Sequence, residues 1–173
     1  PRVVSAGFPA AHDQVMAAEE RLGAIKGALV VNATLEASRV TARVRLVGVH
    51  ETAFDEQAPA ANRLQDTALT ALYQRTDGQM DDIHAARDAA GADVVCLALG
   101  RSDTSSSGLS FLLDDPEDPA NADFAFSVVW YGALSGTTVV AHELGHVLGC
   151  AHDRANALSG AGAFPYSYGH RFT

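Results

Sequence analysis

The run Ala92-Asp93-Val94-Val95-Cys96-Leu97-Ala98-Leu99 decides the fold class of this chain. From Val94 onward it has no polar residue, which is typical of a β-strand that is covered on both faces. Helical and strand patterns alternate on both sides of this run. That alternation favours an α/β fold with a largely parallel sheet, because parallel strands need crossover connections that are usually helical.

The spacing of apolar residues predicts the other elements. Segment 10–31 has apolar residues at helical spacing and predicts a long amphipathic helix, whereas segment 40–49 alternates apolar and polar residues as a half-buried strand does. The run 109–113 is short enough for an edge strand. Further helices are predicted over 64–72, 80–90 and 137–149, and a further strand over 124–131.

Length and composition exclude several classes of protein. The chain has 173 residues, 47% of them apolar, which suits one globular domain better than two domains or a disordered chain. Its 12 basic and 21 acidic residues give a net charge of −9. Nucleic acids and anionic membranes attract basic patches, so neither is an expected partner. No run reaches the roughly 18 to 20 apolar residues of a membrane-spanning helix.

The two cysteines, Cys96 and Cys150, leave the redox state of the chain open. Cys96 lies inside the predicted strand 92–99, where a free thiol packs as a small hydrophobic group. A disulfide between the two cysteines is the alternative, and the distance between them in the fold decides the matter.

The chemistry of the chain is concentrated in His142-Glu143-Leu144-Gly145-His146-Val147-Leu148-Gly149-Cys150-Ala151-His152-Asp153. Two histidines four residues apart project from one face of a helix, a spacing that suits two nitrogen ligands of a zinc ion. Gly149 can adopt a positive φ and end the helix, so that the chain turns back and His152 supplies a third ligand. Three protein ligands leave one position for water, as in catalytic zinc sites.

Glu143 lies beside these ligands on the helix, where it can reach a zinc-activated water without binding the metal. Zinc lowers the pKa of that water and polarises the scissile carbonyl, while Glu143 takes the proton and returns it to the leaving amine. The alternative is a chance match on a surface helix, with a probability of about one in a hundred thousand at average residue usage. The motif therefore predicts a zinc-dependent hydrolase that loses activity as its histidines protonate.

This pattern resembles the zinc-binding signature HExxHxxGxxHD of the metzincin metalloendopeptidases, and residues 40–172 are similar to the bacterial peptidyl-Asp metalloendopeptidases. The resemblance implies one zinc ion held by His142, His146 and His152, with Glu143 as the general base. It implies that protein or peptide substrates are cleaved on the amino side of aspartate. It also implies a secreted enzyme, for which a pro-segment or an inhibitor is a candidate partner. The similar segments outside the motif are 44–49, 77–88, 91–95 and 125–129.

For the fold, the resemblance implies a metzincin-like twisted, mostly parallel sheet with one antiparallel edge strand, packed on a long helix and the active-site helix. Segment 109–113 is the candidate edge strand, so Leu109, Ser110 and Phe111 are candidate substrate-binding residues for an extended peptide. An ordinary strand that covers the core is the alternative. Arg171 is a candidate partner for an aspartate side chain, with a solvated surface arginine as the alternative.

The chain departs from the family pattern in two respects. Metzincins carry a methionine turn after the third histidine, whereas the only methionines here are Met16 and Met80. We therefore expect residues 1–173 to form a single catalytic domain that lacks the C-terminal subdomain with that turn. Gly108 and Gly132, or their neighbours, stand where relatives tend to have cysteines, so no disulfide pairing is carried over.

Other readings of the chain stay open at this point. The acidic loop 114–123 could bind a structural calcium ion through carboxylates, although its spacing is not that of an EF-hand and a solvated loop is the alternative. The enzyme could have a broad or different specificity. The chain could also be a zinc-binding fragment without activity.

Overall fold

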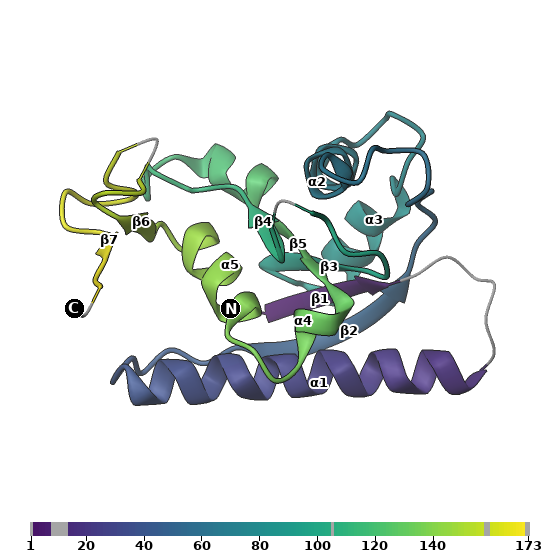
Figure 1. Cartoon of the computed structure of the whole chain (residues 1–173), viewed down its shortest axis with the longest axis horizontal. Helices are drawn as coiled ribbons and strands as arrows, with labels where there is room; N and C mark the ends of the chain where they lie inside the picture. Colours follow the sequence, from purple (N-terminus) through teal and green to yellow (C-terminus); the bar gives the residue numbers. More distant parts are fainter. Residues whose placement is uncertain (1, 8–13, 105, 158–159, 172–173) are drawn as a thin grey trace.

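A five-stranded sheet in the order β2-β1-β3-β5-β4 forms the centre of the computed structural model (Figure 1). The structure describes residues 2–7, 14–104, 106–157 and 160–171, with the backbone alone in 2–7 and 14–20. Neighbouring strands run parallel except at β4, which pairs antiparallel with β5 at one edge. The strands of this sheet are β1 (Arg2–Gly7), β2 (Arg45–Glu51), β3 (Val94–Leu99), β4 (Gly108–Ser110) and β5 (Phe126–Trp130).

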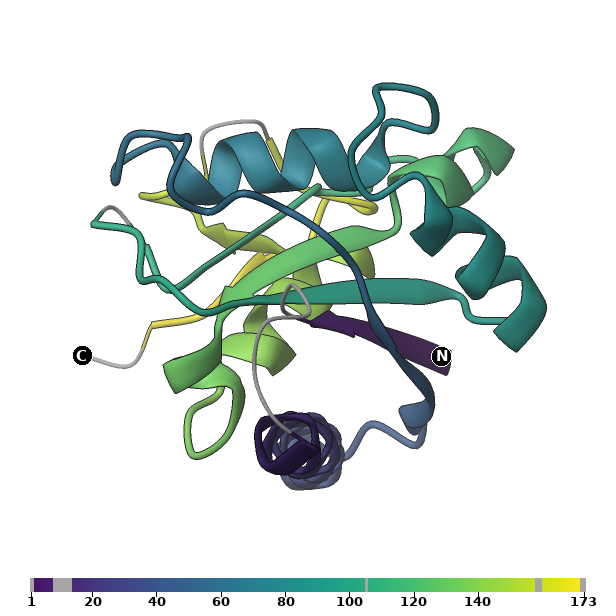
Figure 2. The same cartoon turned by 90° about the vertical axis from the view of Figure 1, so that its right-hand side faces the viewer.

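Helices cover both faces of the sheet and confirm the predicted mixed α/β class (Figure 2). Side chains of α2 and α3 pack against one face, and those of α1, α4 and α5 pack against the other. The helices are α1 (Gln14–Ala37), α2 (Leu64–Tyr73), α3 (Asp82–Ala90), η1 (Pro119–Phe124, a 3-10 helix), α4 (Tyr131–Leu134) and α5 (Val139–Val147). No helix in the described ranges is long and apolar enough to cross a membrane.

Strand β3 is buried along its whole length, as its apolar run predicts. Successive side chains of a strand point to opposite faces, so this one strand serves both cores. Val95, Leu97 and Leu99 pack in the cluster under α2 and α3, whereas Cys96 and Ala98 pack in the cluster under α4. The strand thereby fixes the middle of the sandwich, and α5 is packed on the same face as Cys96.

The two cysteines are free thiols, with Cys96 buried and Cys150 exposed, so the disulfide alternative is wrong. Burial raises the pKa of the Cys96 thiol to about 11. A thiol with so high a pKa carries almost no thiolate near neutral pH and behaves as a packed apolar group.

Several predicted boundaries differ from the observed ones. Strand β1 was not predicted, although it lies between β2 and β3 and pairs with both. The helix predicted over 10–31 is α1, which extends to Ala37, and residues 10–13 lie outside the described part of the chain. The predicted apolar face is wrong in part, because Leu22, Ile25 and Leu29 are exposed. The strand predicted over 40–49 starts only at Arg45, because the Asn32 side chain pairs with both backbone groups of Val44, at 2.8 Å each.

The edge strand is also shorter than predicted. The sequence predicts it over 109–113, but β4 pairs with β5 only over Gly108–Ser110. Beyond Ser110 the chain turns to α5, where the backbone N–H of Leu113 donates a hydrogen bond to the carbonyl of His146 at 3.2 Å. The end of this segment is therefore tied to the helix that carries the motif.

Candidate functional site

Helix α5 carries three of the four motif residues that are chemically important. Its buried residues Leu144 and Val147 pack in a cluster with Val31 of α1. His142 and His146 each lie two residues from Leu144, about 200° round the helix, so they are turned away from that cluster and line a cleft. The apolar spacing of the motif thus fixes the side on which its histidines lie.

The end of α5 is closed by a glycine turn, as predicted. Gly149 has a φ of +87°, and its N–H donates to the carbonyl of His146 at 2.8 Å, while the N–H of Cys150 donates to Gly145 at 2.8 Å. This pair of bonds is the Schellman arrangement, in which a left-handed residue satisfies the last helical carbonyls and reverses the chain. The reversal brings the next segment back beside the helix.

His152 lies on that returning segment, in strand β6 (Ala151–Asp153). Strand β6 pairs in parallel with β7 (Tyr168–Gly169), so the third histidine is held in a small two-stranded sheet. Local chain geometry therefore positions two histidines through a helix and the third through a turn and a strand pair.

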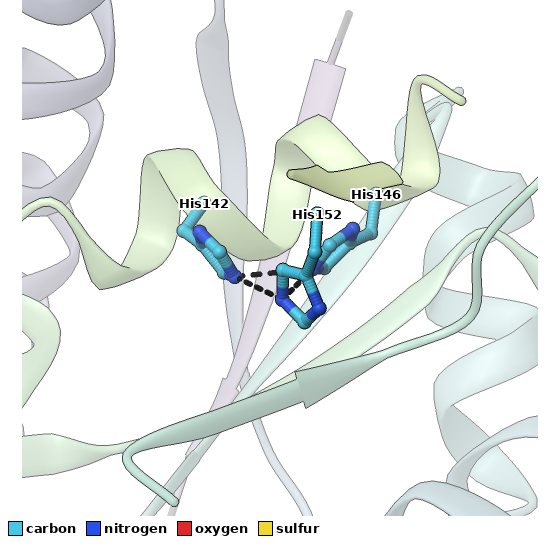
Figure 3. Close-up of side chains that lie close together, drawn as sticks. All are labelled: His142, His146 and His152. Carbon is cyan, nitrogen blue, oxygen red and sulfur yellow. Dashed lines mark hydrogen bonds between the residues drawn. The ribbon is translucent and has the colours of Figure 1, made fainter. Parts of the chain in front are cut away.

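The three imidazoles point toward one another (Figure 3). The Nε2 atom of His142 lies 3.0 Å from the Nε2 atoms of both His146 and His152, and these two lie 3.1 Å apart. Nitrogen ligands of a tetrahedral zinc ion at 2.0–2.1 Å lie about 3.3 Å apart, so the donor set fits zinc with a small expansion. A cation between the rings would also satisfy lone pairs that repel one another when all three imidazoles are neutral.

The orientation of His146 is fixed from its other ring nitrogen. Its Nδ1 lies 2.7 Å from the carbonyl oxygen of Cys150, so Nδ1–H donates and Nε2 keeps its lone pair for a metal. Burial, and less strongly the neighbouring His146 and His152, lowers the pKa of His142. Burial and the neighbouring imidazoles thus both favour the neutral form of His142, which a metal ion requires.

Glu143 is buried beside this group, with only 5% of the residue exposed. Burial raises the pKa of its carboxyl, and a hydrogen bond from Ser110 partly opposes that rise. The Ser110 hydroxyl lies 2.7 Å from Oε2 of Glu143. A carboxyl with a raised pKa is suited to exchange protons nearer neutral pH than an exposed glutamate.

The four motif residues line one wall of a cleft whose other wall is the chain from Ser106 to Leu112, including β4. Strand β4 pairs with β5 on one side only, and it is the last strand of the sheet. The predicted edge-strand residues Leu109, Ser110 and Phe111 all border this cleft. Leu109 and Phe111 also pack against the core under α2, whereas Ser110 contacts α5.

Arg171, the predicted aspartate-binding residue, lies apart from the cleft-lining residues. Its Nε atom lies 3.1 Å from Oδ2 of Asp153, and 74% of its side chain is exposed. The Asn156 side-chain amide is the main cause of a lowered pKa of Asp153, to which Arg171 contributes less. The Arg171 guanidinium is thus paired with the residue that follows His152, and its role in specificity stays a prediction.

Two contributions to the site were not predicted from the sequence. Gly108 lies so close to Glu143 that a Cβ atom on it would be 2.5 Å from Oε1. The carbonyl of Cys150 orients His146. In the sequence, Gly108 stands out only as a place where relatives tend to have a cysteine. No local pattern relates it to α5, which begins at Val139.

Within the described ranges, His142, His146 and His152 are the one group of three or more histidine, cysteine or acidic residues that could hold a metal ion. In the acidic loop, the carboxylates of Asp115 and Asp118 accept hydrogen bonds from backbone N–H groups two residues later. The calcium hypothesis therefore has no support in this loop.

Comparison with known proteins agrees with the site. A family model described as Metallo-peptidase family M12 matches residues 8–171. Over 135 residues the chain is 32% identical to the Peptidyl-Asp metalloendopeptidase of Stenotrophomonas maltophilia (strain R551-3). It is 30% identical to the protein of that name from Xanthomonas campestris pv. campestris. Each alignment covers 78% of this chain and 29% of the relative, so the chain spans less than a third of these relatives.

Solved structures share the fold at lower sequence identity. The crystal structure of metalloproteinase-II from Bacteroides fragilis has a TM-score of 0.55 at 14% identity, over 96% of this chain and 48% of that chain. A chain in a structure titled as a chaperone-substrate complex has a TM-score of 0.61 at 19% identity, over 88% of this chain and 24% of that one. The family model covers almost the whole chain and the named relatives confirm the resemblance drawn from the motif. The chain therefore belongs to metallopeptidase family M12.

Proposed function

We propose that this chain carries the catalytic site of a zinc-dependent endopeptidase that cleaves on the amino side of aspartate. The observation that carries the proposal is the convergence of three Nε2 atoms, within 3.1 Å of one another, beside a buried carboxylate in a cleft. His142, His146 and His152 would hold the zinc ion. Bound there, zinc would polarise the scissile carbonyl and lower the pKa of a water molecule.

Glu143 would then act as the general base. One of its oxygens, Oε2, already accepts a hydrogen bond from Ser110, which leaves Oε1 to accept the proton of the attacking water. The same carboxyl would pass the proton to the amine that leaves. Its burial and raised pKa support this exchange, because a base whose pKa is nearer the working pH also serves as an acid.

Strand β4 would bind the substrate backbone. It is the edge strand of the sheet and borders the cleft opposite α5. An extended peptide can add to such an edge as a further strand, held by main-chain hydrogen bonds that do not depend on its sequence. This placement would set a peptide bond between β4 and the histidines.

The aspartate preference is supported by the names of the similar proteins and by the sequence resemblance. A second candidate is an endopeptidase of broad specificity, because no lysine or arginine stands among the cleft-lining residues that the structure describes. A carboxylate side chain is most strongly bound by a bidentate arginine. Secretion is part of the proposal on the sequence resemblance alone.

Cut-site mapping tests the proposal. The zinc-loaded chain is incubated with an unfolded mixed protein substrate, and the new N-termini are identified by mass spectrometry, with Glu143→Ala as the control. We expect new N-termini that begin with aspartate and no cleavage by the control. New N-termini without preference would favour the second candidate, and no cleavage by the zinc-loaded parent chain would contradict both.

A further inference from the structure

Strand β4 contacts the carboxylate of Glu143 with two of its three residues. Ser110 and Gly108 are two positions apart, so they lie on the same face of the strand. That face meets α5, where Ser110 donates to Oε2 at 2.7 Å and Gly108 leaves the space that Oε1 occupies. The edge strand therefore forms a socket for the carboxylate, in addition to the edge that it presents to the cleft.

The contact at Ser110 uses the only proton that its hydroxyl can donate. The hydroxyl oxygen lies 2.7 Å from Oε2 and 3.1 Å from the backbone carbonyl of Glu143, so the shorter contact is the stronger one. A hydrogen bond to an ionised carboxylate is roughly twice as strong as a neutral one. Ser110 thus fixes which oxygen of Glu143 is occupied and which one is left for a water molecule.

This geometry disfavours the two other roles that a serine in the edge strand could have. A hydroxyl that donates to a substrate would have to give up its bond to a carboxylate that is buried and has little other solvation. A residue that only covers the core would pack with Leu109, which lies on the opposite face of the strand. Neither role requires the contact with Glu143 that is observed.

We propose that Ser110 is a positioning residue, which holds Glu143 in the orientation needed for proton transfer and does not bind the substrate through its side chain. The inference rests on the proposed function, since it assumes that Glu143 is the general base. It goes beyond that function because it assigns a role to a residue 33 positions earlier in the chain, outside the motif.

Kinetics of the zinc-loaded Ser110→Ala and Ser110→Thr variants test the inference. For Ser110→Ala we expect kcat to fall by about 10- to 100-fold, with KM and zinc affinity changed less than about twofold, because the carboxylate loses its donor while the ligands stay in place. Ser110→Thr retains the hydroxyl and should recover most of kcat. An unchanged kcat, or a rise in KM with kcat unchanged, would overturn the inference.

Peptide binding gives a readout that does not depend on activity. In the inactive Glu143→Ala background, the affinity for a peptide that the parent chain cleaves is measured with and without Ser110→Ala. If Ser110 acts only through Glu143, the second substitution leaves the affinity unchanged. A loss of affinity above about fivefold would make Ser110 a substrate-binding residue and overturn the inference.

Folding of the variants and the proposed function are controlled separately. Zinc titration and thermal unfolding show whether Ser110→Ala is folded. If Ser110→Ala neither folds nor binds zinc, Ser110→Thr decides the matter. A Ser110→Thr variant that folds and binds zinc as the parent does but lacks activity would overturn the inference. An inactive parent chain overturns the proposed function and this inference together. An active parent with an equally active Ser110→Ala variant overturns this inference alone.

Discussion

The two walls of the cleft are built in different ways. In the α5–β6 wall, the three histidines and Glu143 come from a segment of 11 residues, and a helix, a glycine turn and a short strand bring them together. In the β4 wall, Ser110 reaches Glu143 across 33 positions of the chain. Local structure thus brings the three imidazoles together, while the tertiary fold places Ser110 against the carboxylate of Glu143.

The largest expected effect separates catalysis from zinc binding within helix α5. Glu143→Ala should lower the rate of peptide cleavage by about 10²- to 10⁴-fold, because it removes the proposed general base but none of the three imidazoles. Zinc affinity, measured by titration of the metal-free protein, should stay close to that of the parent chain. A variant that keeps more than a tenth of the parent rate would contradict the role of Glu143.

The glycine turn of the α5–β6 wall should be sensitive to a single methyl group. Gly149→Ala puts a side chain at a φ of +87°, into the side chain of Ala163 and 2.9 Å from the carbonyl of Leu113. We expect a loss of about 2 kcal/mol or more in the free energy of unfolding, and weaker zinc binding, because His152 follows this turn.

Gly145→Ala is the matched control for that turn. Gly145 lies inside α5, and a Cβ atom there would meet only the Cβ atom of Cys150, at 3.9 Å. Alanine should therefore stabilise the helix by about 0.5–1 kcal/mol without a change in zinc affinity. Urea unfolding of the two variants measures the difference, and equal stabilities would contradict the importance of the left-handed turn.

The β4 wall should be sensitive in activity and not in metal binding. Gly108→Ala would place a Cβ atom 2.5 Å from Oε1 of Glu143, so the carboxylate would have to move. We expect cleavage to fall by about tenfold or more, since a small misplacement of a reacting group is costly. Zinc titration should give the parent affinity. Parent-like cleavage by a folded Gly108→Ala variant would show that the position of Oε1 does not matter.

The smallest expected effect is a pH dependence of the metal-free protein. Burial lowers the pKa of His142 below its ordinary value of 6.5, so the unfolded chain takes up the proton first as the pH falls. The folded state is therefore destabilised as the pH falls through 6.5, and zinc binding weakens in the same range because protons compete. Denaturation midpoints of the metal-free protein from about pH 8 to about pH 5 give the change in stability with pH. This change should be smaller in His142→Ala. Equal changes in the two proteins would contradict the direction of this shift.

The α5–β6 wall could be predicted from the sequence because its geometry is local. A helix brings residues four apart to one face, and glycine is the residue that most easily adopts the φ of +87° found at Gly149. Strand β3 was predicted for a similar reason, since a strand buried on both faces appears as a continuous apolar run.

The β4 wall and the order of the sheet could not be predicted in this way. Alternation shows that Gly108 and Ser110 share a face, but it does not show which helix that face meets. Strand β1 is as long as β3, but Arg2, Ser5 and Gly7 interrupt its apolar residues, and its neighbours β2 and β3 come from segments far along the chain. Long-range pairing of this kind leaves no periodic signal within the strand itself.

X-ray absorption at the zinc edge tests whether the three imidazoles hold one zinc ion. The chain loaded with one equivalent of zinc should show three imidazole nitrogens at about 2.0–2.1 Å and a fourth light ligand. Cys150→Ser should give the same spectrum, because the exposed Cys150 thiol takes no part in the histidine group. A sulfur ligand at about 2.3 Å, or fewer than three imidazoles, would contradict a zinc site made of His142, His146 and His152.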